Sequence, residues 1–295
     1  MRILFRCDAS LEIGSGHLMR CRNLGRALKR RGADVLFICR EHNYNLLTTL
    51  REEFLVLVLG AHEMKKIKSL SGAELYAEWL GCSQERDAED CLTILDRANI
   101  GELDWIVVDH YSLNKIWHLQ ILKALSNIQS CKPKFLILDD LADRSHFADC
   151  LVDASQLTSE ACDIYKQLVP HGCRLFIGPA YAQLDSLYSQ LQPICPPRQE
   201  LRRVLVFFGA VDQANQCYVA LEALNHPRLT HLAVDVVLGR DAPHREIINQ
   251  LVQRRPNTCL HIGVPSLAGL MLRADLAIGA AGTASWERAA LGLPS

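Results

Sequence analysis

Short apolar runs alternate with longer amphipathic segments along the first two thirds of the chain. The runs are "RILFRC", "ADVLFIC", "EFLVLVL", "DWIVVD", "KFLILDD" and "DCLVDA", which begin at residues 2, 33, 53, 104, 134 and 149. Runs of this length and composition predict strands. Between the first two, Leu18, Leu24 and Leu28 recur at helical spacing before Gly32, which predicts one amphipathic helix. The alternation favours βαβ units around a parallel sheet.

The alternation is interrupted at residues 190–203, "QLQPICPPRQELRR", where three prolines break any regular pattern. It then restarts with "RVLVFFGAVDQANQ", "HLAVDVVLG", "TCLHIG" and "ADLAIGAAGTASWERAALGLP". We therefore predict an α/β protein with two doubly wound, Rossmann-like domains, residues 1–192 and 193–295, and a cleft between them. The sequence ends just past a helix expected to begin near Thr283, so we expect the second domain to be incomplete.

Composition narrows the classes of partner. The chain has 295 residues, of which 49% are hydrophobic, enough for two cores. Its 32 basic and 33 acidic residues give a net charge of -1, which offers no long-range attraction to nucleic acid. The N-terminal apolar run is too short for a signal peptide, and no run reaches the roughly 18 apolar residues of a membrane span. We expect a soluble, cytoplasmic protein.

Twelve cysteines are present, but none forms a C-x-x-C pair. This spacing argues against zinc and redox sites. Several cysteines lie in or beside apolar runs, where a reduced thiol behaves as a small hydrophobic group. We predict buried free thiols.

The loop after the first strand, within "ILFRCDASLEIGSGHLMRC" at residues 3–21, is the first candidate site. It has no third glycine of a dinucleotide fingerprint, because Met19 stands there, and no Walker lysine follows. Gly14 and Gly16 permit a tight turn, and His17 begins a helix at the edge where α/β sheets hold ligands. The helix dipole favours a neutral imidazole that accepts a proton. The alternative is a solvent-exposed residue at a helix start.

A second candidate is "GAAGTASWE", residues 279–287, which follows the strand "ADLAIG". Small residues and hydroxyls at a helix start leave backbone N–H groups for a diphosphate, and Glu287 could accept both ribose hydroxyls. The alternative is an ordinary capped helix with an acidic residue near its start. The turn "FFGAVDQ", residues 207–213, could supply further N–H groups.

A third candidate lies at the end of the strand in "WIVVDHYSL", where Asp109, His110 and Tyr111 follow one another. Polar residues at that end of a strand suit a crevice wall, although each alone is also an ordinary turn residue. The segment "LILDDLAD", residues 136–143, carries paired carboxylates at the same kind of position. It lacks a further cluster of ligands in the sequence, so we predict no metal.

Together, "FRCDASLEIGSGHLMRC", "VVDHYSL", "FFGAVDQAN" and "AGTASWERAALGLPS" resemble the UDP-sugar hydrolases of pseudaminic acid biosynthesis, which cleave UDP-2,4-diacetamido-2,4,6-trideoxy-β-L-altropyranose. That family is similar in fold to the GT-B glycosyltransferases, in which the second domain holds most of the nucleotide. The resemblance implies a GT-B-like fold, a UDP-sugar as the small-molecule partner, direct attack by water with inversion, and no cofactor. It also implies a role upstream of flagellin glycosylation. We expect a monomer that binds neither nucleic acid nor membrane.

The resemblance assigns roles to residues of this chain. It implies that His17 serves hydrolysis, that Tyr111 lines the sugar site, and that the Gly282–Glu287 helix start holds UDP. Asp8 and Asp109 are candidates to orient the imidazole or the sugar, and we count Asp109 with the catalytic group. The expected substrate contacts are Asp8, Gly14, Gly16, Arg20, Gly209, Asp212, Gly282, Thr283, Ser285 and Glu287. One departure is Ala210, where relatives commonly have a second glycine.

Two other functions remain open from the sequence. A GT-B glycosyltransferase would transfer the same kind of sugar to an acceptor, with nearly the same fold and nucleotide site. A lipid acceptor would call for an apolar or basic patch on the first domain, but residues 29–31, "KRR", are better explained as a solvated helix end. The other alternative is an inactive nucleotide-sugar binder.

Overall fold

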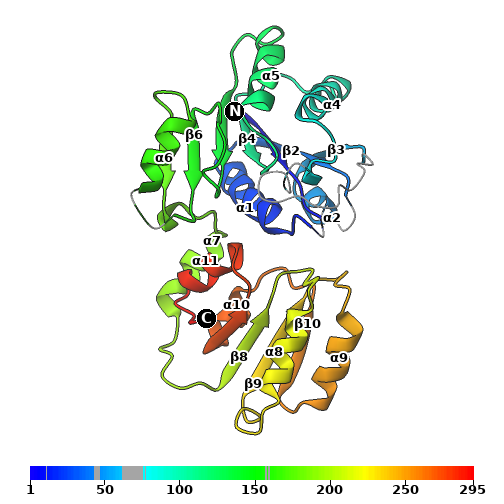
Figure 1. Ribbon diagram of the computed structural model, residues 1–295, viewed down its shortest axis with the longest axis vertical. Coiled ribbons are helices and arrows are strands. Elements are labelled where there is room, and N and C mark those ends of the chain that lie inside the picture. The colour runs from blue at the N-terminus through cyan, green and yellow to red at the C-terminus, as the bar shows by residue number, and fades with distance from the viewer. Residues whose placement is uncertain (11, 43–46, 62–75, 77, 157, 159) are drawn as a thin grey trace. The chain divides into compact units, whose positions relative to one another are not determined.

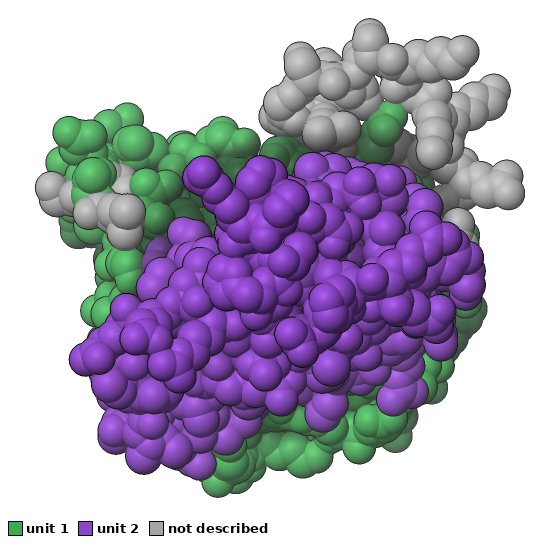
Figure 2. All heavy atoms as spheres, turned by 90° about the horizontal axis from the view of Figure 1, so that it is seen from below, with its two compact units in different colours: residues 1–13, 17–183 green, residues 14–16, 184–295 purple. Residues whose placement is uncertain are grey.

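The computed structural model describes the chain in two compact units, each with its own parallel sheet (Figure 1). The first unit comprises residues 1–13 and 17–183, and the second comprises residues 14–16 and 184–295 (Figure 2). The described residues are 1–10, 12–42, 47–61, 76, 78–156, 158 and 160–295. Within these ranges, none of the helices combines the length and apolar character needed to cross a membrane.

The sheet of the first unit has seven strands in the order β3-β2-β1-β4-β5-β6-β7, and all its neighbours are parallel. The strands are β1 (Arg2–Cys7), β2 (Asp34–Arg40), β3 (Leu55–Leu59), β4 (Trp105–Asp109), β5 (Lys134–Leu138), β6 (Cys150–Asp153) and β7 (Arg174–Ile177). The chain extends to one side of β1 through β3, then returns to its other side with β4. This reversal makes the carboxyl ends of β1 and β4 the place where such sheets bind ligands.

Helices cover both faces of this sheet. They are α1 (Gly16–Arg30), α2 (Leu47–Arg51), α4 (Gln84–Arg97), α5 (Lys115–Ser126), α6 (Glu160–Leu168) and the short 3-10 helix η1 (Pro179–Tyr181). On one face, Phe5 and Phe37 pack with Leu18 of α1, while on the other Val108 packs with Trp117 of α5. Two buried cores therefore hold the sheet from both sides.

Local signals set the helix ends in this unit. The Ser83 hydroxyl accepts the N–H of Arg86 at the start of α4, and the Asn114 side chain accepts the N–H of Ile116 at the start of α5. These side chains satisfy N–H groups that have no partner within the helix. Past the end of α1, Gly32 has a φ of 86°, the left-handed conformation that stops a helix.

The second unit has a four-stranded parallel sheet in the order β10-β9-β8-β11. Its elements are α7 (Ser186–Leu191), η2 (Gln192–Ile194), β8 (Arg203–Phe207), α8 (Gln216–Leu224), β9 (Ala233–Leu238), α9 (Arg245–Arg254), β10 (Thr258–Ile262), α10 (Ala268–Arg273), β11 (Leu276–Gly279) and α11 (Thr283–Ala290). One face packs against α8 and α9, and the other against α7, α10 and α11. The predicted linker, residues 190–203, lies in this unit and includes η2.

The predicted strands of both sheets are confirmed, with one addition. The strand β7 was not predicted, because "RLFI" is only four residues long and opens with a charged residue. All twelve cysteines are free, as predicted, but the prediction that they are buried is wrong for several of them. Cys131 lies in a polar loop and Cys259 on the edge strand β10, and both are exposed.

Candidate functional site

The glycine loop between β1 and α1 is held by its own side chains. The Ser10 hydroxyl accepts the N–H of Ile13 at 3.0 Å, and Gly14 adopts a φ of 76°, a conformation that favours glycine. Gly16 then begins α1, which makes His17 the second residue of the helix. The predicted turn into a helix-starting histidine is therefore present, and the His17 side chain is 9% exposed.

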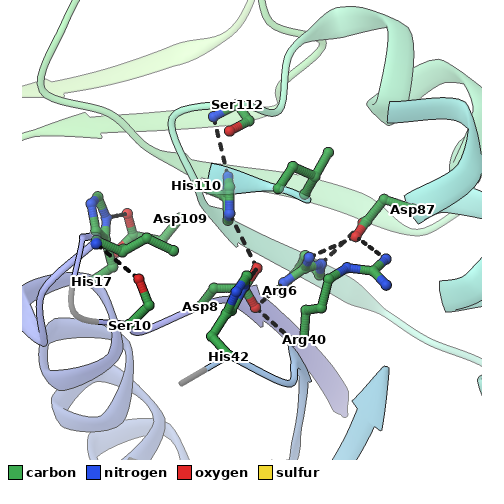
Figure 3. Close-up of polar contacts among 12 residues, drawn as sticks. Arg6, Asp8, Ser10, His17, Arg40, His42, Asp87, Asp109, His110 and Ser112 are labelled. Carbon is green, nitrogen blue, oxygen red and sulfur yellow. Dashed lines mark hydrogen bonds and ion pairs between the residues drawn. The ribbon is translucent and has the colours of Figure 1, made fainter. Parts of the chain in front are cut away.

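The histidine is paired with an aspartate from another strand. Asp109 ends β4, which pairs with β1 so that Asp109 lies opposite Cys7. The Nδ1 atom of His17 lies 2.5 Å from Oδ1 of Asp109 (Figure 3). A carboxylate only accepts hydrogen bonds, so Nδ1 carries a proton, and the neutral tautomer that fits this contact has its lone pair on Nε2. Among the described residues, none is hydrogen-bonded to Nε2.

Arg20, one turn further along α1, fixes this aspartate. Its Nε and Nη2 atoms donate to the two oxygens of Asp109, each at 2.6 Å. Burial alone raises the pKa of the Asp109 carboxyl, but the charge of Arg20 and the contact with His17 outweigh it and hold that pKa below its ordinary value. Asp109 is therefore ionised at neutral pH and can stabilise a protonated imidazole.

Tyr111 completes the cluster on the other side of the imidazole. Its ring contacts the His17 ring edge to face, with 4.5 Å between centroids, and stacks with Trp79 at 5.7 Å. The Tyr111 hydroxyl donates to Asp140 at 2.7 Å, and Arg20 donates to the same oxygen at 2.6 Å. Burial and the charge of Asp140 raise the pKa of Tyr111, so the phenol remains a donor.

Two members of this cluster were not among the predicted site residues. Asp140 follows β5, the neighbour of β4, in the paired-carboxylate segment "LILDDLAD". Its position was the available signal, because carboxyl ends of adjacent parallel strands meet at one edge. Trp79 precedes α4 in a segment with no strand or turn pattern that would have singled it out.

Asp8 lies apart from the imidazole, in a buried charge network (Figure 3). Its Oδ1 accepts from Nη1 of Arg6 at 2.5 Å and from the N–H of Arg40 at 2.7 Å, and His110 Nε2 lies 3.1 Å from Oδ2. Asp87 of α4 pairs with both arginines at 2.7 Å. Burial raises the pKa of Asp8, but Arg6 outweighs it and lowers that pKa. The network ties β1, β2 and β4 to α4, and a substrate contact of Asp8 stays a prediction.

In the second unit, the turn after β8 closes on the next helix. Gly209 has a φ of 98°, while the two oxygens of Asp212 accept the N–H groups of Gln216 and Cys217, each at 2.8 Å. These bonds give the Asp212 carboxylate the role of a cap at the start of α8. Its predicted contact with substrate stays a prediction.

The turn after β11 leads into α11 through Gly282, which has a φ of 138°. Thr283 begins the helix, and Ser285 accepts from Nη2 of Arg288 at 3.0 Å. Burial raises the pKa of Glu287 to about 7, although a hydrogen bond from Tyr188 opposes the shift. The predicted small-residue turn at a helix start is therefore present, and the side chain of Glu287 is partly buried.

In the described part of the chain, no group of three or more His, Cys, Asp and Glu side chains is arranged to hold a metal ion. The paired carboxylates of "LILDDLAD" instead contact arginines and tyrosines: Asp140 meets Arg20 and Tyr111, and Asp139 meets Arg144 and Tyr165.

Comparisons with known proteins give distant likenesses. No family model matches the chain. The spore coat polysaccharide biosynthesis protein SpsG of Bacillus subtilis is 26% identical over 122 residues, which cover 41% of this chain and 36% of that protein. The uncharacterized protein MJ1062 of Methanocaldococcus jannaschii is 22% identical over 303 residues, covering 100% of this chain and 54% of that protein. The chain thus matches about half or less of the length of these relatives.

Several solved structures share the fold at low sequence identity. Arabidopsis thaliana UGT89C1, complexed with UDP-L-rhamnose, matches with a TM-score of 0.59 and 17% identity over 99% of this chain and 78% of its own. The spinosyn rhamnosyltransferase SpnG matches with a TM-score of 0.57 and 14% identity over 100% and 79%. MurG of Acinetobacter baumannii matches with a TM-score of 0.52 and 12% identity over 99% and 76%. With its two parallel sheets, the chain has the GT-B architecture of two Rossmann-like domains.

Proposed function

We propose that this chain is a UDP-sugar hydrolase that releases UDP and the free sugar with inversion at the anomeric carbon. We further propose that its substrate is a UDP-linked 2,4-diacetamido-2,4,6-trideoxy sugar. Support comes from the sequence resemblance and from the fold shared with structures solved with UDP-L-rhamnose, with UDP-GlcNAc, or with UDP and glucose. The SpsG likeness also connects the chain to polysaccharide biosynthesis.

The observation that carries the proposal is the pairing of His17 with Asp109. The 2.5 Å contact at Nδ1 leaves the lone pair of Nε2 to accept a proton, which is the arrangement of a general base with an orienting carboxylate. The pair lies at the carboxyl ends of β1 and β4, where doubly wound sheets bind ligands. A base in this position contributes roughly 10² to 10⁴ in rate.

The proposed reaction is a single displacement. A water oxygen forms a bond to the anomeric carbon while the bond from that carbon to the phosphate oxygen breaks, and its electron pair leaves with UDP. The attacking water gives one proton to Nε2 of His17, and ionised Asp109 stabilises the imidazolium. Attack opposite the leaving group inverts the anomeric centre without a covalent intermediate.

The proposal assigns UDP to the second unit, where Gly282 and Thr283 form a glycine turn into α11. Backbone N–H groups at a helix start stabilise charge on phosphate oxygens. Such groups could support the departing diphosphate without a metal, so we expect UDP release to persist in the presence of EDTA.

A direct test measures UDP release from the UDP-sugar without any acceptor. We expect turnover by the wild-type chain and a loss of roughly 10² to 10⁴ in kcat for His17→Ala. His171→Ala is the matched control, because His171 is an exposed histidine of the same unit, and its kcat is expected to equal that of the wild type. Equal rates for the two variants would contradict the assignment.

The same assay separates the alternatives. A glycosyltransferase, like the rhamnosyltransferase SpnG, would release UDP only after an acceptor is added. A nucleotide-sugar binder would show saturable binding in calorimetry without turnover under either condition. Either result would replace the hydrolase proposal.

A further inference from the structure

Two adjacent aspartates at the end of β5 have different surroundings. Asp139 is fully buried, and its Oδ2 accepts the N–H of Ala142 at 3.0 Å and the hydroxyl of Tyr165 at 2.8 Å. Its Oδ1 lies 2.7 Å from Nη2 of Arg144. These contacts hold the turn that follows β5. The next residue, Asp140, is presented by that turn and contacts the His17 cluster instead.

One oxygen of Asp140 holds two members of the cluster at once. Its Oδ2 accepts from the Tyr111 hydroxyl at 2.7 Å and from Nη1 of Arg20 at 2.6 Å. The Nε and Nη2 atoms of Arg20 donate to the two oxygens of Asp109. A continuous chain of contacts therefore runs from Asp140 through Arg20 to Asp109 and the imidazole.

We propose that Asp140 is a positioning residue that keeps the base of the proposed hydrolysis in its working orientation. It acts through Arg20, which fixes Asp109, and through Tyr111, whose ring packs against His17. The inference rests on the proposed function, in which His17 accepts the proton of water.

Charge supports the same role. The positive charge of Arg20 is shared between the carboxylates of Asp109 and Asp140, so the cluster carries one net negative charge while the imidazole is neutral. Uptake of a proton by His17 brings the cluster to neutrality. Without Asp140, the same proton would leave a net positive cluster, which is unfavourable among buried groups. Asp140 thus supports both the geometry and the charge balance of proton transfer.

Asp140→Asn tests this role, because it keeps the size and an acceptor oxygen but removes the charge. We expect kcat to fall by about 10- to 100-fold, the range expected when a catalytic group is displaced, while KM stays near the wild-type value. Asp140→Glu restores the charge and is expected to recover part of the loss. Asp143→Asn is the matched control, because Asp143 is an exposed aspartate of the same loop that pairs with Arg144, and its kcat is expected to remain unchanged.

A second measurement does not depend on turnover. The N–H proton between His17 and Asp109 should give a far-downfield proton NMR resonance, assigned by its absence in His17→Gln. We expect Asp140→Asn to shift or broaden this resonance and Asp143→Asn to leave it in place. An unchanged resonance, an unchanged kcat, or equal losses in the two asparagine variants would overturn the inference. If the wild-type chain releases no UDP, the hydrolase proposal fails, while the resonance still tests the positioning by Asp140.

Discussion

Asp109 of the first unit and Asp235 of the second are buried aspartates that contact a histidine and arginine, yet the two clusters lie in different parts of their sheets. In the second unit, Asp235 contacts Nε2 of His261 at 2.7 Å and Nη2 of Arg273 at 2.6 Å, with Nη1 of Arg203 at 2.9 Å. Asp109 ends its strand beside the reversal point of the sheet, whereas Asp235 is the third residue of β9, opposite Cys259 of the edge strand β10. The same residue types thus occur at the carboxyl end of a strand in one unit and within a strand in the other.

The set of residues alone therefore does not distinguish a candidate reaction site from a structural cluster, and the free atoms of the histidine must be considered as well. His17 follows a glycine turn, is buried and contacts its aspartate through Nδ1, while His261 contacts its aspartate through Nε2. Burial raises the pKa of both aspartates, but cationic partners outweigh it and lower both. Electrostatics alone would therefore not separate the two clusters.

The largest expected effect is on the first cluster. Asp109→Asn removes the charge that fixes the tautomer of His17, and we expect kcat for UDP release to fall by up to about 10⁴, as when the aspartate of a Ser-His-Asp triad is replaced by asparagine. Circular dichroism before the assay would establish that the variant is folded. A variant that turns over at the wild-type rate would remove the distinction between the clusters.

In the second cluster, the matching change should alter stability instead. Asp235→Asn leaves two arginines that are 35% and 47% exposed and can be solvated, so we expect the free energy of unfolding to fall by about 1–3 kcal/mol. Urea denaturation measures that loss, and kcat at 25 °C should match the wild type. A large fall in kcat for the folded variant would show that sheet position is a poor guide to function.

Glu287 differs from Asp109 because burial raises its pKa and its partners do not reverse the shift. Its contribution to stability should therefore change with pH in the direction opposite to that of Asp109. The pKa of Glu287 is raised to about 7, so the folded protein binds more protons than the unfolded chain between an ordinary glutamate pKa, about 4.3, and that value. Its contribution to the free energy of unfolding falls by about 3–4 kcal/mol as pH rises through this window. Glu287→Gln should remove that fall in urea titrations at pH 5 and pH 8. The ionised Asp109 carboxylate stabilises the folded protein at pH values above the ordinary aspartate pKa. This contribution is lost as the pH falls through the lowered pKa of Asp109 in the folded protein.

Hydrophobic patterning was sufficient to predict both sheets, because buried parallel strands read as apolar runs whatever surrounds them. The edge strand β7 has a short run with a charged start, so the pattern did not reveal it. Sequence position also named His17 and Asp109 as candidates, but they are 92 residues apart. Their contact depends on β4 pairing with β1, which is a property of the sheet order.

Side chains that act through others were harder to predict. In the sequence, Asp140 is only one of two adjacent carboxylates. The structure gives them different partners, because Asp139 accepts from Tyr165 and Asp140 accepts from Tyr111. Asp212 was predicted to contact the substrate, but a turn residue after a strand can either face a ligand or cap the next helix. Its oxygens bind N–H groups of α8, and the sequence pattern does not distinguish these outcomes.

Substitution of His261 should have only a small effect on stability. His261→Gln keeps a donor near Asp235, and the two arginines continue to neutralise the carboxylate, so we expect a loss of no more than about 1 kcal/mol in the free energy of unfolding and an unchanged kcat. His17→Gln, measured in parallel, offers the same side chain at the other cluster but cannot accept and hold the proton of water. If the pairing of a histidine with a buried aspartate were itself enough for activity, the two variants would lose similar rates. A loss confined to His17→Gln would show that the strand end and the glycine turn give the pair its chemistry.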